Sequence, residues 1–274
     1  MNETVLEERA PGGLHDFLVN RILPVYARPP GRAVDLGCGS GALAVRLRAA
    51  GWDVVAADID AKAYKASIPF VPVDLNDPDF PSALPGKFDL VTAVEVIEHL
   101  ESPIHFLRGV AQILAPTGIA LVTTPNVENL PGRLWFLLTG KLRTMDRRPA
   151  AIPHPHISPV FLDLLHREWV PRAGLRLRAR YLYPERGFLL SRSTVRLTLG
   201  LAALLLPSQR LRGESHVLLL ERADISKGNG SPVITPGLAR LRAGPASLAL
   251  VLLVFTLRAC WGFMWGSNVW VSSR

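Results

Sequence analysis

An acidic residue, Asp35, lies in a short apolar run and is followed at once by three glycines. A ligand can approach the backbone closely at Gly37, Gly39 and Gly41 because no Cβ stands in the way, and the helix that this turn opens offers unpaired N–H groups. The fingerprint of dinucleotide-binding proteins is G-x-G-x-x-G, so the third glycine is misplaced for that class. An acid two residues before the first glycine would also repel a pyrophosphate, whereas it suits the ammonium of an amino-acid-like ligand. We therefore expect such a ligand here; the alternative is an ordinary glycine-rich turn.

Two further acids end apolar runs later in the chain. Asp58 follows Asp35 by 23 residues, close to the spacing of a carboxylate that accepts from the hydroxyl pair of a ribose. One carboxylate can accept from two neighbouring hydroxyls at once, and Ile59 beside it offers an apolar surface to a flat base. Asp74 could accept from an exocyclic amine of that base. Alternatively, both acids are solvated residues at strand ends.

Glu95, Glu98 and His99 form an E-x-x-E-H cluster after the fourth apolar run. Residues three and four apart share a side of a helical turn, so we expect these side chains to lie near one another. An unperturbed imidazole titrates near neutral pH, which makes His99 the leading candidate for a base. The alternative for Glu98 and His99 is a structural pair at a helix start.

Apolar runs that alternate with helix-like segments must position these residues. The alternation predicts an α/β fold with a doubly wound, mostly parallel seven-stranded sheet and an antiparallel strand at its edge. Pro72 places the third strand near the sheet margin or at a bulge. Ligands of such sheets bind beyond the carboxyl ends of the strands, where Asp35, Asp58, Asp74 and Glu95 would lie. The predicted strands cover residues 33–36, 53–58, 70–74, 88–94, 119–124, 175–183 and 214–221, and the predicted helices cover 14–26, 42–47 and segments opened by Pro103 and Pro159.

Length and cysteine content limit the classes of protein that fit. The 274 residues suffice for one α/β domain with a full core plus one appendage. The two cysteines, Cys38 and Cys260, lie far apart and outside any metal-type cluster, so we expect a reducing compartment and no disulfide framework. The polar, acidic residues 1–9 predict no secretory signal peptide.

Charge is divided unevenly along the chain. The net charge is −6 over residues 1–129 and +14 over residues 130–274, which together give the +8 of the whole chain. The basic half also holds the long apolar runs and interleaves few aromatic residues with its charges. This composition favours an anionic membrane surface over nucleic acid; a solvated basic face is the alternative.

Several stretches lie outside the predicted sheet. The expected domain covers residues 1–223 with insertions over about 127–157 and 186–212, followed by a polar linker over 224–236 and an apolar tail over 237–274. Arg258 divides the tail into two uncharged runs, each shorter than the ~20 residues of a spanning helix. Trp residues near Arg258 favour the membrane–water boundary. We expect an interfacial or re-entrant anchor, with a true span or packing on protein as the alternatives.

The motifs stand in the order of a known family. The sequence resembles the class I S-adenosylmethionine-dependent methyltransferases, in particular the branch that includes the ubiquinone-pathway O-methyltransferases and relatives from cell-surface polysaccharide clusters. The resemblance covers roughly residues 14–182 and the strand around Val217, and it departs from the family at Thr117, where Pro-Gly-Gly is usual. It rests on the motifs at residues 34–41, 57–60, 88–100, 114–118 and 123–126.

The resemblance implies S-adenosylmethionine as the methyl donor. Its methionine part would pass the glycine turn, Asp58 would hold the ribose, and Asp74 with Leu75 would frame the adenine. The expected cofactor-binding residues are Asp35, Gly37, Cys38, Gly39, Gly41, Asp58, Ile59, Asp74, Leu75, Val94 and Glu95. The resemblance also implies a divalent metal such as Mg²⁺ on Glu95, Glu98 and His99. It places His156 at the acceptor, unless His156 is an ordinary loop histidine.

We therefore predict a methyltransferase that acts on oxygen of a small-molecule or lipid-linked acceptor, with His99 and His156 as catalytic residues. Methyl transfer from a sulfonium needs positioning, exclusion of water and, for a hydroxyl acceptor, a base. The apolar segment 130–148 with basic flanks implies contact with lipid, or else a lid on its own domain. The expected location is cytoplasmic, peripheral or tail-anchored at the inner membrane face, with no nucleic-acid partner and an open oligomeric state. A membrane-associated scaffold without turnover is the alternative, and a nicotinamide-dependent oxidoreductase is disfavoured by the misplaced glycine.

Overall fold

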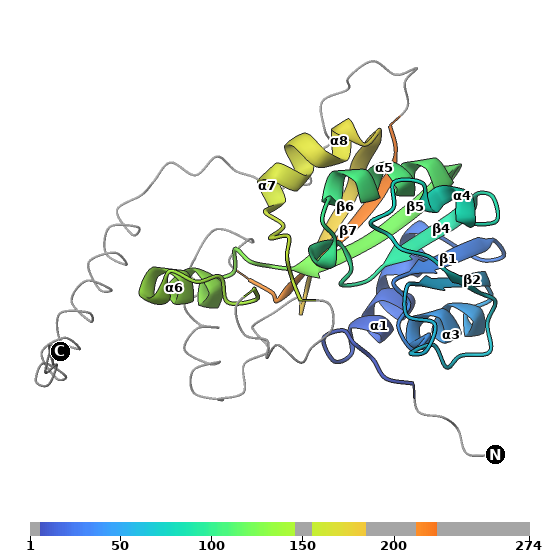
Figure 1. Ribbon diagram of the computed structural model, residues 1–274, viewed down its shortest axis with the longest axis horizontal. Helices are drawn as coiled ribbons and strands as arrows, with labels where there is room; N and C mark the ends of the chain where they lie inside the picture. The colour runs from blue at the N-terminus through green and yellow to red at the C-terminus, as the bar shows by residue number, and fades with distance from the viewer. Residues whose placement is uncertain (1–5, 146–154, 185–211, 224–274) are drawn as a thin grey trace, which may run out of the picture. The chain divides into compact units, whose positions relative to one another are not determined.

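A single seven-stranded sheet organises the chain (Figure 1). The computed structural model describes residues 6–145, 155–184 and 212–223. The strand order is β3-β2-β1-β4-β5-β7-β6. The strands are β1 Arg32–Leu36, β2 Asp53–Asp58, β3 Phe70–Pro72, β4 Phe88–Ala93, β5 Leu114–Pro125, β6 Leu175–Tyr183 and β7 Ser215–Arg222. The expected number of strands and the doubly wound parallel core are therefore confirmed.

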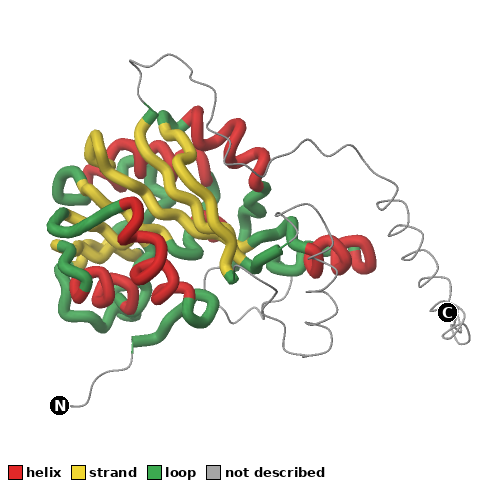
Figure 2. The backbone as a smooth tube through the Cα atoms, turned by 180° about the vertical axis from the view of Figure 1, so that it is seen from behind, coloured by secondary structure: helices red, strands yellow, loops and turns green. Residues whose placement is uncertain are grey.

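Helices cover both faces of the sheet (Figure 2). Because successive side chains of a strand point to opposite faces, Val91 and Ala93 of β4 enter one hydrophobic core and Leu90 enters the other. The first core also receives residues of α4, α5, α7 and α8, and the second those of α1, η1, α2 and α3. The helical segments are α1 Leu14–Phe17, η1 Leu18–Ile22, α2 Leu23–Tyr26, α3 Ala42–Ala49, α4 Phe80–Ala83, η2 Ile97–His99, α5 Pro103–Ile113, α6 Leu130–Thr139, α7 Leu162–Leu164, η3 Leu165–Trp169 and α8 Val170–Arg172.

The sequence predicted an antiparallel strand at the edge of the sheet, but the antiparallel strand lies inside the sheet. β7 runs antiparallel to both of its neighbours, β5 and β6, and β6 forms the edge. The reason is a tertiary contact: Ser215 pairs with Tyr183, and the Glu214 N–H donates to the Tyr183 carbonyl at 2.7 Å. The chain thus returns to the sheet beside the end of β6, and β7 is placed between β6 and β5. At the other edge, β3 ends at Pro72, which confirms the marginal place predicted for it.

Some element boundaries differ from those predicted. β5 begins at Leu114 rather than at residue 119, the helical segment expected from Pro159 begins at Leu162, and the short helix α4 was not predicted. Most of the expected insertion over 186–212, the linker over 224–236 and the tail over 237–274 lie outside the described residues. Among the described helices, none has the length and apolar character to cross a membrane.

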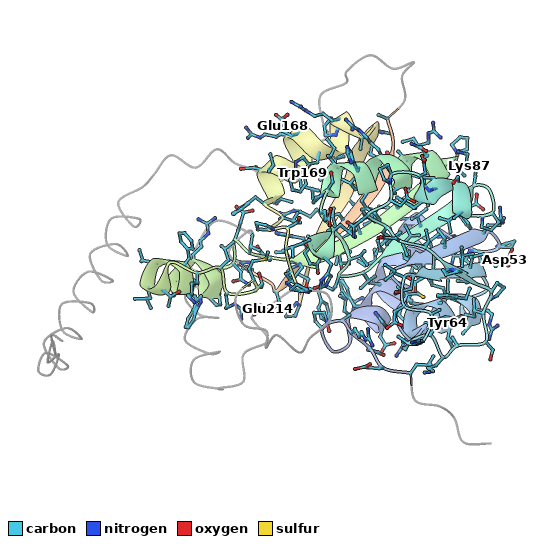
Figure 3. All side chains as sticks on the ribbon, viewed as in Figure 1. Asp53, Tyr64, Lys87, Glu168, Trp169 and Glu214 are labelled. Atoms are coloured by element: carbon cyan, nitrogen blue, oxygen red, sulfur yellow. The ribbon has the colours of Figure 1, made fainter. Side chains whose placement is uncertain are left out.

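Helix α6 follows the carboxyl end of β5 and ends at Gly140, which has a φ of +72°. The side chain of Asn129 caps the first turn by accepting from the Gly132 N–H at 2.8 Å. Glu214, labelled in Figure 3, accepts from Asn129 and forms an ion pair with Arg143 just beyond the helix. This partly buried network fixes the root of α6 against the start of β7. About half of the surface of Phe136, Leu137 and Leu138 nevertheless remains exposed on the helix.

Candidate functional site

A cavity of about 730 Å³ lies beyond the carboxyl ends of β1, β2 and β4. This volume is within the usual range of small-molecule sites, about 300–1,000 Å³. The sequence-predicted residues that line it are Asp35, Gly37, Cys38, Gly39, Asp58, Ile59, Asp74, Leu75, Val94, Glu95, His99 and His156. Two predicted site residues, Gly41 and Glu98, are not part of the lining.

The glycine turn joins β1 to α3 in a conformation that side chains would obstruct. Gly37 has a φ of +67°, and a Cβ there would lie 2.5 Å from a methyl of Val96. Gly39 has a φ of +52° and faces the cavity. Gly41 instead caps α3 at a φ of +90°, where a Cβ would meet Ala66 at 2.5 Å. Gly41 therefore allows close packing behind the turn, which corrects its predicted contact with a ligand.

Asp35 is a buried acid of the cavity with a strongly raised pKa. Its register position opposite Thr92 on β4 lets the threonine hydroxyl donate to Oδ1 at 2.8 Å. The other oxygen, Oδ2, is buried and accepts no hydrogen bond from the described residues. Burial, together with the negative charge of nearby Asp58, raises the pKa of Asp35 to about 7. A cationic donor placed at Oδ2 would satisfy both its hydrogen bonding and its charge.

Asp58 turns its carboxylate toward the glycine turn. Oδ2 accepts from the Gly39 N–H at 2.8 Å and Oδ1 accepts from the Asp60 N–H at 2.9 Å. Both bonds lock the side chain at the cavity wall, one strand away from Asp35. Each oxygen has further lone pairs for a hydroxyl donor. The arrangement therefore suits a ligand with two adjacent hydroxyls.

The wall beyond Asp58 combines apolar and acidic side chains. Ile59 is 55% exposed although it is a large aliphatic residue, and it lines the cavity together with buried Leu75. Asp74 is oriented by the Asn76 N–H, which donates to its Oδ1 at 2.9 Å. The pair of apolar surfaces and one acceptor matches the needs of a flat heteroaromatic base with an exocyclic amine.

Cys38 contributes shape to the cavity. The side chain is buried, and burial followed by the charges of Asp35 and Asp58 raises the pKa of its thiol. A thiol held neutral in this way is a poor nucleophile. Cys38 therefore acts as a small apolar wall residue.

The N-terminal segment supplies a wall that the sequence had not predicted. Glu7, Arg9 and His15 all line the cavity, opposite the glycine turn. Arg9 is the only Lys or Arg in the described lining, so it can face the carboxylate of an amino-acid-like ligand. Burial lowers the pKa of His15 and favours its neutral form. The available signal was the charged stretch at residues 7–9 just before the first predicted helix.

Glu95 has an unusual backbone, because its φ is +56° and it is the only described residue other than glycine with a positive φ. Such a conformation is costly in a side-chain-bearing residue. Thr123 holds it in place: the Glu95 N–H donates to the threonine Oγ1, and that hydroxyl donates to Oε1 of Glu95, each at 2.9 Å. The strain lies at the mouth of the cavity, where Glu95 and His99 were expected to share one helical turn. They do not, because the helical turn η2 begins only at Ile97.

The structure brings Glu98 and His99 together with His156 instead. One ligand atom from each residue lies within 4.8 Å of the others, and the two imidazole rings meet edge to face with centroids 4.6 Å apart. The backbone also joins the segments, since the N–H groups of Ile157 and Ser158 donate to the Glu98 carbonyl at 2.9 Å. The metal set predicted from the sequence, Glu95 with Glu98 and His99, stays a prediction; the structure groups His156 with Glu98 and His99. A carboxylate with two imidazoles suits several divalent ions.

The tautomer of His99 follows from one contact. Its Nδ1 lies 3.2 Å from the carbonyl oxygen of Pro155, and a carbonyl oxygen only accepts. Nδ1 therefore carries the hydrogen, and Nε2 is the atom that can take a proton or ligate a metal. A backbone carbonyl behind a histidine is also the usual support for a metal-ligating ring.

Comparison with known proteins decides the family. The family described as "Methyltransferase domain" matches residues 6–182, well over half of the chain. The chain belongs to this methyltransferase family. The resemblance seen in the sequence is thereby confirmed.

Curated relatives of this methyltransferase are named ubiquinone biosynthesis O-methyltransferases. That of Xanthomonas campestris pv. campestris (strain B100) is 31% identical over 119 residues, which cover 40% of this chain and 48% of the relative. That of Pseudoalteromonas translucida (strain TAC 125) is 25% identical over 177 residues, or 60% of this chain and 70% of the relative. The first of these alignments thus spans about half of the relative's length.

Solved structures confirm the methyltransferase fold. An S-adenosylmethionine-dependent methyltransferase from Archaeoglobus fulgidus superposes with a TM-score of 0.53 at 15% identity and covers 76% of this chain and 94% of its own. One from Clostridium acetobutylicum ATCC 824 gives a TM-score of 0.52 at 11% identity, with 77% and 91% covered. At these identities the likeness concerns the fold alone.

Proposed function

We propose that the protein is an S-adenosylmethionine-dependent methyltransferase that transfers the methyl group to an oxygen atom of a small-molecule acceptor. The observation that carries this proposal is the buried Oδ2 of Asp35, an acceptor without a hydrogen-bond donor among the described residues, in a cavity shared with Asp58 and Ile59. Ammonium, ribose and base are the three parts of S-adenosylmethionine that these side chains suit. The curated relatives are named O-methyltransferases, which supports an oxygen atom as the methyl acceptor.

In this proposal each wall residue has a separate task. Asp35 receives the ammonium, Arg9 faces the carboxylate, and Asp58 accepts from the ribose hydroxyls. The donor supplies an activated methyl group, so the protein must align the acceptor, exclude water and remove a proton. The acceptor oxygen forms its bond to the methyl carbon as the carbon–sulfur bond breaks, and Nε2 of His99 takes the hydroxyl proton. His156 packs against the His99 ring and keeps that nitrogen aimed at the acceptor.

A divalent cation would fit beside His99, where the acceptor is expected to bind. Glu98, His99 and His156 would hold it, and it would lower the pKa of a hydroxyl bound beside it. In that case His99 ligates the ion and does not act as the base. Methyl transfer measured after chelation and after return of Mg²⁺, Mn²⁺ or Zn²⁺ separates the two roles: loss and recovery indicate the cation, and unchanged rates indicate His99 as base.

Calorimetry with S-adenosylmethionine and with S-adenosylhomocysteine tests the donor site. We expect one site per chain in the wild type. Asp58→Ala should weaken binding at least tenfold, because it removes the acceptor of two ribose hydroxyls and releases Gly39 and Asp60. Asp53→Ala is the matched control, an acid at the opposite end of β2. Absence of binding to the wild type would refute the proposed function, and binding without any turnover would favour the scaffold.

We also propose that the acceptor is presented at a membrane surface. The support is the exposed apolar side chains of Phe136, Leu137 and Leu138 near the end of α6, the basic composition of the second half of the chain and the apolar tail over 237–274. Exposed apolar side chains with basic surroundings favour binding to the interface of anionic lipids.

Flotation with vesicles rich in phosphatidylglycerol tests the membrane proposal. The full chain should float, and changing Phe136, Leu137 and Leu138 to serine should lower the bound fraction. Val25→Ser, at a residue that is 65% exposed, is the control for loss of surface hydrophobicity. Deleting residues 237–274 as well should abolish the remaining binding to vesicles. A full chain that stays in the soluble fraction would show that the membrane proposal is wrong. This result would leave the proposal for the donor site unaffected.

A further inference from the structure

A strap formed by residues 6–16 closes one side of the donor cavity. Its residues Glu7, Arg9, Ala10, Pro11 and His15 contribute to the lining. The strap passes the glycine turn directly, because the Ser40 hydroxyl donates to the Glu7 carbonyl at 2.7 Å. The strap and the glycine turn are therefore adjoining walls, and a ligand that fills this cavity would contact both.

One residue outside the cavity joins both ends of the strap to the domain. Arg46 lies on α3, one turn after Ala42, and does not line the cavity. Its Nη2 pairs with Glu8 near the start of the strap, and its Nε donates to Oδ1 of Asp16 at 3.1 Å near the end. The remaining nitrogen, Nη1, donates to the Ala42 carbonyl at 3.1 Å. Every arm of the guanidinium is thus engaged, which fixes its orientation.

The strap contains a place where it can bend. Gly12 and Gly13 separate residues 7–11 of the strap from α1, and Gly13 has a φ of +79°. A Cβ on Gly12 would have no atom within 4 Å, whereas the hydroxyl of Tyr183 on β6 donates to the Gly12 carbonyl at 2.5 Å. The bend is thus anchored to the sheet at one point, and the segment before it can pivot there. If the ion pair of Arg46 with Glu8 were lost, the segment before the glycines would keep the Ser40–Glu7 hydrogen bond but lose its charged anchor. It would then open more often while α1 stayed in place.

We infer that Arg46 is a clasp that holds the strap over the bound donor and thereby sets how fast the donor and its demethylated product exchange. This inference rests on the proposed function. Arg46 acts through the strap and is a positioning residue. Each partly exposed ion pair makes a modest contribution, so loss of both should increase opening about three- to thirtyfold. Because the lining residues themselves are unchanged, the effect should fall on dissociation and leave association unaltered or faster.

Stopped-flow binding of S-adenosylhomocysteine to the full chain measures both rates. Arg46→Gln should raise the dissociation rate constant about three- to thirtyfold, and Arg46→Lys, which keeps one charged contact, should recover part of the loss. Arg48→Gln is the matched control, since Arg48 lies on the same helix and donates only to the Ser67 carbonyl among the bonds of the described residues. The control should change dissociation less than twofold.

A second set of variants tests the clasp from the strap side. The double variant Glu8→Gln with Asp16→Asn leaves α3 intact and should reproduce the rate of Arg46→Gln, and the triple variant should add nothing, because all three residues form one unit. Salt should speed dissociation from the wild type but not from these variants. If both Arg46→Gln and the double variant dissociate at the wild-type rate, the clasp is wrong. A wild type that binds no S-adenosylhomocysteine would instead overturn the proposed function.

Discussion

Binding of S-adenosylmethionine should release a proton from Asp35. In the ligand-free protein, burial raises the pKa of this carboxyl to about 7, so about nine-tenths of the molecules carry the proton at pH 6. An ammonium placed at Oδ2 favours the carboxylate and expels that proton. We therefore expect about 0.9 proton released per ligand bound at pH 6, and about 0.1 at pH 8.

The same linkage sets the pH dependence of affinity. Below pH 7 the dissociation constant should rise about tenfold for each pH unit, and above pH 7.5 it should level off. Measurements between pH 5.5 and 6.5 keep the ligand's own amino group charged, because an α-amino group titrates at about 7.7–8.0. Calorimetric titrations with S-adenosylmethionine in buffers of different ionisation enthalpy measure the number of protons released. This number is the slope of the observed binding enthalpy against the ionisation enthalpy of the buffer.

Asp35→Asn provides the decisive control. It keeps an oxygen for the Thr92 hydroxyl but cannot titrate, so its slope should be zero and its affinity weak at every pH. A wild type with no proton release at pH 6, or an Asn variant with the wild-type slope, would refute the ammonium assignment. The lining histidines His15, His99 and His156 are present in both proteins, so the difference between them isolates Asp35.

Three further perturbations have defined outcomes. Gly109→Ala should lower the free energy of unfolding by about 1–3 kcal/mol in urea titrations, because the new Cβ would lie 2.2 Å from the Phe80 ring. Since burial lowers the pKa of His15, its contribution to stability should be constant above pH 6.5 and decline as the pH falls below that value; His15→Gln should remove this decline. Thr123→Val should slow methyl transfer about tenfold by releasing Glu95, whereas Thr123→Ser should retain most of the rate.

Most of the fold could be predicted because its strands are short, apolar and separated by clear breaks. The runs at residues 53–58 and 88–94 needed only local pattern, and the structure places β2 at Asp53–Asp58 and β4 at Phe88–Ala93. The position of β7 could not be predicted in this way. It depends on where the chain returns after β6, and the pairing of Ser215 with Tyr183 is a tertiary contact with no local signal.

The residues of the site likewise differ in how far the local sequence could predict them. Residues at strand ends, such as Asp35 and Asp58, were predictable because parallel strands end at one rim of the sheet. Arg9 reaches the cavity from a loop whose path is set by packing elsewhere, and His156 was expected there only through the family resemblance. The expectation that Glu95 and His99 share one helical turn was wrong, because the turn begins only at Ile97. The left-handed backbone of Glu95 redirects the chain, and the Thr123 clamp that holds it comes from a strand 28 residues later.

The energetics of Asp35 also separate a methyltransferase from a scaffold of the same fold that has lost its donor site. Raising the pKa of a carboxyl from 3.8 to about 7 means that the charged form costs about 4 kcal/mol of stability above pH 7. This penalty develops between pH 3.8 and about 7, because the folded protein holds the proton there and the unfolded chain does not. A scaffold gains nothing from it, so Asp35→Asn should then be stabilising by up to about 4 kcal/mol at pH 8 and functionally silent. In a methyltransferase the same substitution should stabilise the empty protein and abolish the stabilisation by S-adenosylmethionine, since the cation that offsets the buried charge no longer has a partner. Urea unfolding at pH 8 with and without the ligand distinguishes these two outcomes.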